Sequence, residues 1–148
     1  MINLFNKNTL YGSMLIIIGF APLPGNAAAE VAIIAGKQVQ SNAVSAAYIK
    51  KIFLGKKRSL PDGYPVKPVD QREDSSAYKE FYSKVVNKKA SQLKSYWSKM
   101  IFSGKARPPK VVGNDAQVKN WVKNNPGSIG YISSSSVDAS VKVLLRVR

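Results

Sequence analysis

The segment from Val69 to Tyr78 carries the side chains in this sequence that are best suited to bind an anion. It leads from an apolar run through hydroxyl residues into a stretch of helical periodicity, so the hydroxyls are expected at a helix amino terminus. The first N–H groups of a helix lack internal partners and are partially positive, and Ser75 and Ser76 add hydroxyl donors there. Arg72 adds a planar, permanently charged fork that matches two oxygens of a phosphate. The segment therefore predicts an anion site made by Arg72, Ser75 and Ser76.

The same residues also fit a purely structural role. Asp74, Ser75 or Ser76 can cap the helix by accepting a backbone hydrogen bond. Arg72 can pair with Glu73 or Asp74 at the surface, where an ion pair contributes little to stability. The sequence leaves both interpretations open.

The composition excludes most catalytic and metal chemistry. The chain contains no Cys and no His, which rules out Ser-His-Asp and Cys-His catalysis, Cys or His metal sites and disulfides. It has 8 Asp and Glu residues, and no pair of them stands in a setting suited to general acid–base catalysis. We therefore expect a non-enzymatic protein with no catalytic residues, no metal and no cofactor.

The charge balance favours an anionic partner. The chain has 23 Lys and Arg residues and a formal net charge of +15, a field that attracts phosphate-bearing ligands, nucleic acid, acidic polysaccharides or anionic head groups. Because Lys is spread along the whole chain, the charge also fits simple solubilisation. The rings of Tyr96 and Trp97, which lie close to Lys99 in the sequence, could stack on nucleic-acid bases. Their helical spacing with Leu93 and Met100 fits a core face better, so we do not expect nucleic acid as a partner.

The first 29 residues have the pattern of a cleaved secretory signal peptide. Lys7 is the only charged residue there and precedes a short apolar run that prolines close. Ala27 and Ala29 then occupy the A-x-A positions that signal peptidases recognise. The apolar run is too short for a membrane-spanning helix, which needs about 20 residues. We therefore expect an exported, periplasmic protein whose mature domain, residues 30–148, does not span the membrane.

Hydrophobic periodicity predicts an alternation of strands and helices in the mature domain. The strands are expected at 31–35, 66–69, 129–132 and 141–147, and the helices at 42–54, 76–86, 93–101 and between 114 and 125. Ser41 or Asn42 should cap the first helix and Gly55 should end it. The run at 31–35 is apolar throughout, as in a strand buried on both faces, and the basic last strand suits a sheet edge. The order predicts a single α/β domain with a mixed sheet covered by about four helices.

Several short motifs follow one another along residues 30–148: Ile52-Phe53-Leu54-Gly55-Lys56, Pro61-Asp62-Gly63, the segment from Val69 to Tyr78, Phe81-Tyr82, Tyr96-Trp97, Phe102-Ser103-Gly104 and Pro126-Gly127-Ser128-Ile129-Gly130-Tyr131. In this order they resemble the PstS-like phosphate-binding proteins, which are periplasmic substrate-binding proteins of ABC transporters. The chain looks like a short, single-domain member of that superfamily.

The matched anion segment keeps part of the family pattern. In the full-length relatives this stretch resembles Arg-x-Asp-Gly-Ser-Gly-Thr and holds phosphate through its Arg, its hydroxyls and its backbone N–H groups. Arg72, Asp74 and Ser76 match it directly. Ser75 and Ala77 replace the two glycines, and Tyr78 replaces the threonine.

The resemblance implies a truncated lobe of a type II periplasmic binding protein, because the relatives close two lobes around the ligand. It implies a non-enzymatic binding protein for phosphate or a similar oxyanion, with Arg72 as a clamp and Ser75 and Ser76 as donors. An ABC permease is then a candidate partner. The replaced glycines and threonine favour an alternative, an interaction module that kept the fold, lost its ligand and docks on an envelope protein or an anionic envelope polymer.

Overall fold

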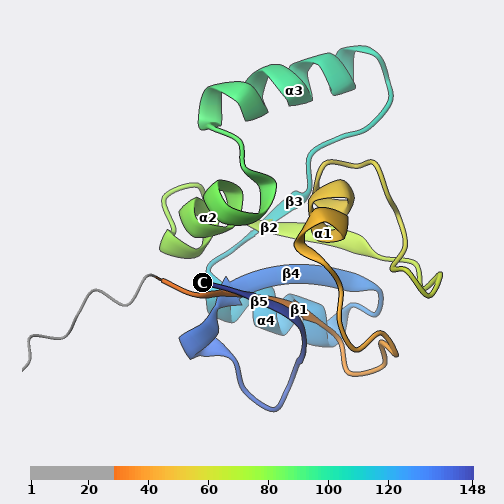
Figure 1. The fold of residues 1–148 in the computed structure, drawn as a ribbon, viewed down its shortest axis with the longest axis vertical. Coiled ribbons are helices and arrows are strands. Elements are labelled where there is room, and N and C mark those ends of the chain that lie inside the picture. The colour runs from red at the N-terminus through yellow and green to blue at the C-terminus, as the bar shows by residue number, and fades with distance from the viewer. Residues whose placement is uncertain (1–28) are drawn as a thin grey trace, which may run out of the picture.

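The computed structural model describes residues 29–148, which form an α/β fold around one five-stranded mixed sheet in the order β3-β2-β4-β1-β5 (Figure 1). The strands are β1 (Val31–Ala35), β2 (Lys67–Gln71), β3 (Lys110–Gly113), β4 (Ser128–Ser133) and β5 (Lys142–Val147). Strand β2 runs parallel to both β3 and β4, whereas β1 runs antiparallel to β4 and β5. The predicted mixed sheet is confirmed. The predicted signal peptide, apart from Ala29, lies outside the described residues.

Within residues 29–148, four α-helices accompany the sheet, as predicted. They are α1 (Ala46–Phe53), α2 (Ser76–Phe81), α3 (Ala90–Phe102) and α4 (Asp115–Asn124), and a π-helical turn, η1 (Tyr82–Val86), continues α2. Helices α1 and α2 bury side chains in the main hydrophobic cluster, which covers one face of the sheet. Helix α4 packs through Val118 and Val122 in a second cluster on the other face. The two clusters give the domain its layered arrangement of helices on both faces of the sheet.

Strand β1 and three aromatic rings form the centre of the core. Every residue of β1 is buried, which confirms the strand predicted from its continuous apolar run. Phe81 stacks on Tyr131 with ring centroids 4.0 Å apart, and Phe53 lies 4.6 Å from Phe81. Burying a ring of this size contributes about 1.5–3 kcal/mol relative to exposure. These contacts join α1, α2 and β4 into one unit.

Two local predictions are wrong. Strand β3 was not expected, because it is four residues long, follows two prolines and has two exposed residues at the sheet edge. Helix α1 begins at Ala46, and its cap is Ser45, whose hydroxyl accepts from the N–H of Tyr48 at 3.3 Å. The predicted cap Ser41 instead donates to Asp62 at 2.6 Å. Before α1, the Val44 N–H donates to the Leu144 carbonyl, and Ser45 has an extended backbone conformation.

Helix α3 stands apart from the sheet (Figure 1). Leu93 is its one buried residue, and Tyr96 and Trp97 pack against the main cluster, which confirms their expected core-facing role. The Tyr96 hydroxyl donates to the Leu54 carbonyl at 2.6 Å. Phe102, at the end of α3, is 96% exposed. None of the helices within residues 29–148 is both long and apolar enough to cross a membrane.

Candidate functional site

The three parallel strands β2, β3 and β4 have their carboxyl ends on the same side of the sheet, and polar residues lie there. Strand β2 ends at Gln71, β3 at Gly113 and β4 at Ser133. From β2 the chain enters α2 on one face of the sheet, and from β3 it enters α4 on the other face. Connections that diverge in this way open a crevice at the carboxyl ends of the strands, where open α/β sheets usually bind ligands.

A crevice of about 690 Å³ occupies this position. Its walls are the start of α2, the start of α4 and the segment that follows β4. That segment contains a short 3₁₀ turn, η2 (Ser134–Ser136). The crevice contains two predicted site residues, Ser75 and Ser76, together with Asp115, Lys119, Ser136 and Asp138.

The start of α2 presents unused hydrogen-bond donors. Ser75 is the cap of α2, and its hydroxyl oxygen accepts from the Tyr78 N–H at 3.1 Å. Its carbonyl accepts from the Lys79 N–H at 3.3 Å. Within the described residues, the N–H groups of Ser76 and Ala77 have no acceptor. The Ser75 hydroxyl can still donate its hydrogen while it accepts. Capping therefore leaves the first donors of α2 available to a ligand.

Arg72 lies on the turn that leads into α2, outside the walls of the crevice. The Ser75 N–H closes that turn on the Arg72 carbonyl at 3.0 Å. The guanidinium donates to Asp74 through Nε at 3.1 Å and Nη2 at 2.6 Å, and both side chains are 67% exposed. The structure thus shows the ion pair that the structural interpretation requires. Asp74 engages the Nε and Nη2 edge of the guanidinium, and Nη1 has no hydrogen-bond acceptor among residues 29–148.

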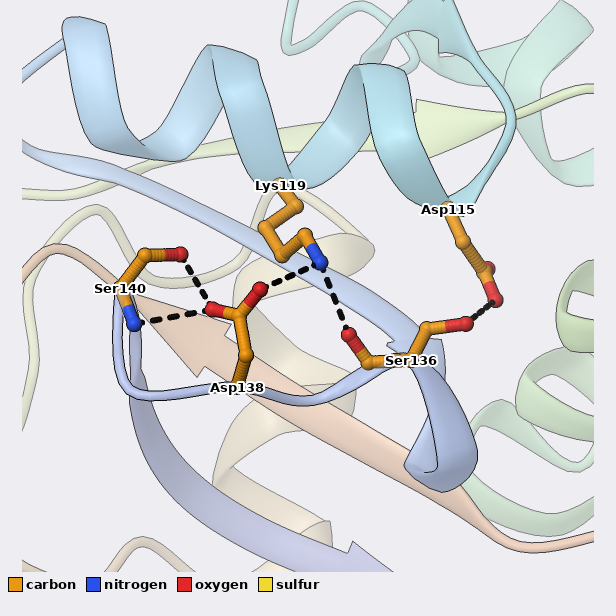
Figure 2. Close-up of polar contacts among 5 residues, drawn as sticks. All are labelled: Asp115, Lys119, Ser136, Asp138 and Ser140. Carbon is orange, nitrogen blue, oxygen red and sulfur yellow. Dashed lines mark hydrogen bonds and ion pairs between the residues drawn. The ribbon is translucent and has the colours of Figure 1, made fainter.

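Asp115, the first residue of α4, ties the strand ends together. Its Oδ1 accepts from Gln71 Nε2 at 2.6 Å, and its Oδ2 accepts from the Ser133 N–H at 3.2 Å. Oδ2 also accepts from the Ser136 hydroxyl at 2.7 Å, the contact that Figure 2 shows. Asp115 and Ser136 were not predicted as site residues. Ser136 follows the predicted strand at 129–132, and that position is the signal that could have identified it, whereas Asp115 follows β3, which the sequence did not predict.

Lys119 and Asp138 form an ion pair in the wall of the crevice. Lys119 Nζ donates to Asp138 Oδ2 at 2.7 Å and to the Ser136 carbonyl at 3.0 Å (Figure 2). The N–H and hydroxyl of Ser140 donate to the other oxygen of Asp138. These bonds from Lys119 and Ser140 hold the pKa of Asp138 well below its ordinary value. Asp138 is therefore ionised at neutral pH and is neutralised by Lys119.

Gln71 brings a buried polar group to the crevice. Its side chain is 1% exposed, and Nε2 donates to Asp115 and to the Tyr131 carbonyl at 2.9 Å. Because both partners are acceptors, they fix which end of the amide carries the nitrogen. Within residues 29–148, Gln71 Oε1 has no donor. A buried acceptor of this kind is costly unless a ligand or a water supplies a hydrogen.

Behind Gln71, Asp70 lies in a buried network that the sequence did not predict. Tyr131 and Tyr82 each donate a hydroxyl hydrogen to the Asp70 carboxylate, the Tyr82 contact being 2.5 Å long. Burial raises the pKa of Asp70, and the two tyrosine hydrogen bonds oppose that rise. Burial and the charge of Asp70 raise the pKa values of both tyrosines. The network is structural, since Asp70 is 6% exposed and does not line the crevice.

Within residues 29–148, no group of three or more Asp or Glu side chains is placed to hold a metal ion. The crevice therefore has hydrogen-bond donors and single carboxylates to offer a ligand.

The fold is similar to about half of several solved phosphate-binding proteins. One is described as a candidate phosphate ABC transporter substrate-binding protein with bound phosphate, from Clostridium perfringens, with a TM-score of 0.62, 24% identity and coverage of 78% of this chain and 45% of that one. An ABC-type phosphate transport receptor from Vibrio cholerae has a TM-score of 0.62, 20% identity and coverage of 78% and 46%. PstS from Borrelia burgdorferi has a TM-score of 0.57, 15% identity and coverage of 78% and 47%.

This chain spans about half the length of those structures. No protein-family model and no curated protein matches the sequence. The predicted resemblance to PstS-like periplasmic binding proteins is confirmed at the level of the fold, as the TM-scores show.

Proposed function

We propose that this protein is a non-enzymatic binding domain for phosphate or a similar oxyanion, and that the crevice at the carboxyl ends of β2, β3 and β4 is its ligand site. The observation that carries the proposal is the convergence of unused N–H donors of α2, serine hydroxyls and a buried unpaired acceptor in one crevice. The similarity in fold to proteins described as phosphate-binding supports the choice of ligand.

The ligand oxygens lie on the α2 side of the crevice. There the N–H groups of Ser76 and Ala77 and the hydroxyls of Ser75 and Ser76 donate to one anion, and the positive end of α2 favours its charge. Arg72 approaches through its Nη1 donors while Asp74 holds the opposite edge of the guanidinium. A charge-assisted bond of this type is about twice as strong as a neutral one.

The carboxylates of the crevice do not exclude an anion. Asp115 is compensated by three donors, and Asp138 by Lys119. The unpaired Oε1 of Gln71 requires a donor, and a protonated phosphate carries one whereas sulfate does not at neutral pH. We therefore expect the crevice to bind phosphate more tightly than sulfate.

Isothermal titration of residues 30–148 with phosphate and with sulfate at low ionic strength tests the proposal. We expect a phosphate Kd below about 1 mM, which corresponds to about −4 kcal/mol, and weaker binding of sulfate. The crevice has walls on one domain, so the affinity is expected to stay modest. A phosphate Kd of about 1 mM or higher at low ionic strength would contradict the proposal.

We also infer that the protein is exported, with residues 1–29 removed, and that it acts in the periplasm, where an ABC permease is a candidate partner. The pattern of Lys7, the apolar run and Ala27-x-Ala29 supports export. Mass spectrometry of the protein from the periplasmic fraction should show Glu30 as its amino terminus. An intact amino terminus in the cytosolic fraction would contradict this inference.

A further inference from the structure

A second cavity lies at the opposite end of the parallel strands from the crevice. This groove of about 990 Å³ is lined by Lys67 and Lys110, the first residues of β2 and β3, and by Ser128, the first residue of β4. The ends of α1 and α4, the loop between α1 and β2 and the loop between α3 and β3 complete its walls. The groove shares no lining residue with the crevice, so it is a separate surface of the domain.

The groove concentrates positive charge that the described protein does not neutralise. Its lining includes five cationic residues and no Asp or Glu: Lys57, Arg58, Lys67, Arg107 and Lys110. Within residues 29–148, none of the five forms a salt bridge. The carboxyl ends of α1 and α4 each supply about half a negative charge, which is far less than five full charges. An anionic partner would relieve the repulsion.

The rest of the accessible wall is apolar and stiff. It includes Tyr64, Pro65, Pro108, Pro126 and Trp121, and proline has little conformational freedom to lose when a partner docks. Hydrogen-bonding side chains other than the cations are few. This surface therefore suits a partner that carries both acidic and apolar groups.

We propose that this groove docks an extended, acidic segment of a partner protein, whose carboxylates meet the lysines and arginines while its apolar side chains cover the prolines and Trp121. Polysaccharides fit less well, because each sugar hydroxyl that leaves water needs a hydrogen-bond partner and the groove offers mainly cations. Bases of nucleic acid need a free ring face. Lys110 Nζ lies over the Trp121 ring, 4.2 Å from its centroid, and occupies that face.

Fluorescence anisotropy with defined probes tests the proposal on residues 30–148. The main probe is a labelled peptide in which Glu alternates with Pro and Leu. Two control peptides carry Gln in place of Glu, or Ser in place of Pro and Leu. A labelled heparin oligosaccharide and a labelled oligothymidylate represent the other classes of polyanion. We expect the Glu, Pro and Leu peptide to bind at least about tenfold more tightly than either control peptide.

Two charge-reversal variants distinguish binding in the groove from attraction by the overall positive charge of the protein. Lys67→Glu with Arg107→Glu alters the groove, and Lys37→Glu with Lys94→Glu makes the same change of net charge at exposed positions outside it. We expect the groove variant to lose at least about tenfold in peptide affinity and the matched variant less than about threefold. Should the groove variant fail to fold, Lys57→Gln with Arg58→Gln replaces it, and Lys37→Gln with Lys94→Gln is then the control with the same change of net charge.

Three results would overturn the proposal: absence of peptide binding, equal losses in the two charge-reversal variants, or a groove-dependent loss that is larger for heparin or oligothymidylate than for the peptide. Phosphate titration of the same variants tests whether the groove acts independently of the phosphate site in the crevice. The groove variant should retain the phosphate affinity of the unmodified protein, because the groove and the crevice share no residues.

Discussion

Gln71 Nε2 donates to Asp115 Oδ1 across 2.6 Å and so links the end of β2 to the start of α4. Asp115 also receives the Ser133 N–H and the Ser136 hydroxyl, which brings the end of β4 to the same carboxylate. The Asp115 side chain therefore joins the ends of β2 and β4 to the start of α4, beside the crevice.

Asp115→Ala should destabilise the fold by about 1–3 kcal/mol, because Gln71 and Ser133 lose their acceptor in a partly buried setting. Chemical denaturation at neutral pH measures the change. Asp138→Ala is the matched control and should cost less, since its carboxylate lies at an exposed ion pair with Lys119. An Asp115→Ala variant as stable as the unmodified protein would show that these bonds do not support the crevice.

Arg72→Ala should weaken phosphate binding by about one to two orders of magnitude while barely changing the melting temperature. The small thermal effect is expected because the Arg72–Asp74 pair is exposed. Arg72→Lys should restore part of the affinity, since it keeps the charge but loses the planar fork.

Arg146→Ala is the control for the Arg72 variants, because Arg146 is an exposed arginine on β5, away from the crevice. It should leave phosphate affinity close to that of the unmodified protein. Equal losses in the Arg146 and Arg72 variants, or full affinity in Arg72→Lys, would indicate binding by the overall positive field instead of a built site.

The buried carboxyl of Asp70 should affect the pH dependence of stability. Burial raises its pKa in the folded state above the unfolded value, so the folded protein binds the proton more tightly. The stabilisation from this carboxyl is complete below the unfolded pKa and is lost as pH rises through the folded pKa. Asp70→Asn removes that titration.

The free energy of unfolding of the unmodified protein, measured relative to Asp70→Asn, should therefore decrease as pH rises from about 4 through the folded pKa of Asp70. Urea denaturation at a series of pH values gives this difference. A difference that stays constant would mean that the tyrosine hydrogen bonds balance the burial of Asp70, and one that grows with pH would mean that they outweigh it; either result would contradict the prediction.

Much of the fold could be predicted because its signals are local. The apolar run of β1 and the helical spacing around Phe81 and Trp97 depend on neighbouring residues. Strand β3 escaped detection because it is four residues long and its two valines, at the edge of the sheet, form neither an alternating pattern nor a long apolar run. The start of α1 was misplaced because Ser41 bonds to Asp62, 21 residues away, and this contact is invisible to a local pattern.

The site could be predicted only in part for the same reason. Ser75 and Ser76 stand directly before a periodic stretch, so their place at the start of α2 was evident. The contacts of Gln71 with Asp115 and of Asp70 with Tyr131 join residues 44 and 61 positions apart. Such contacts depend on the strand order of the sheet, which the sequence pattern did not specify.

The most direct test of the proposed oxyanion site follows backbone amide signals by nuclear magnetic resonance during a phosphate titration of residues 30–148. The proposal predicts saturable shifts that are largest at the Ser76 and Ala77 amides, with a Kd below about 1 mM, and smaller shifts when sulfate replaces phosphate. Shifts that are absent at these two amides, or that spread over the lysine-rich surface without saturating, would contradict it.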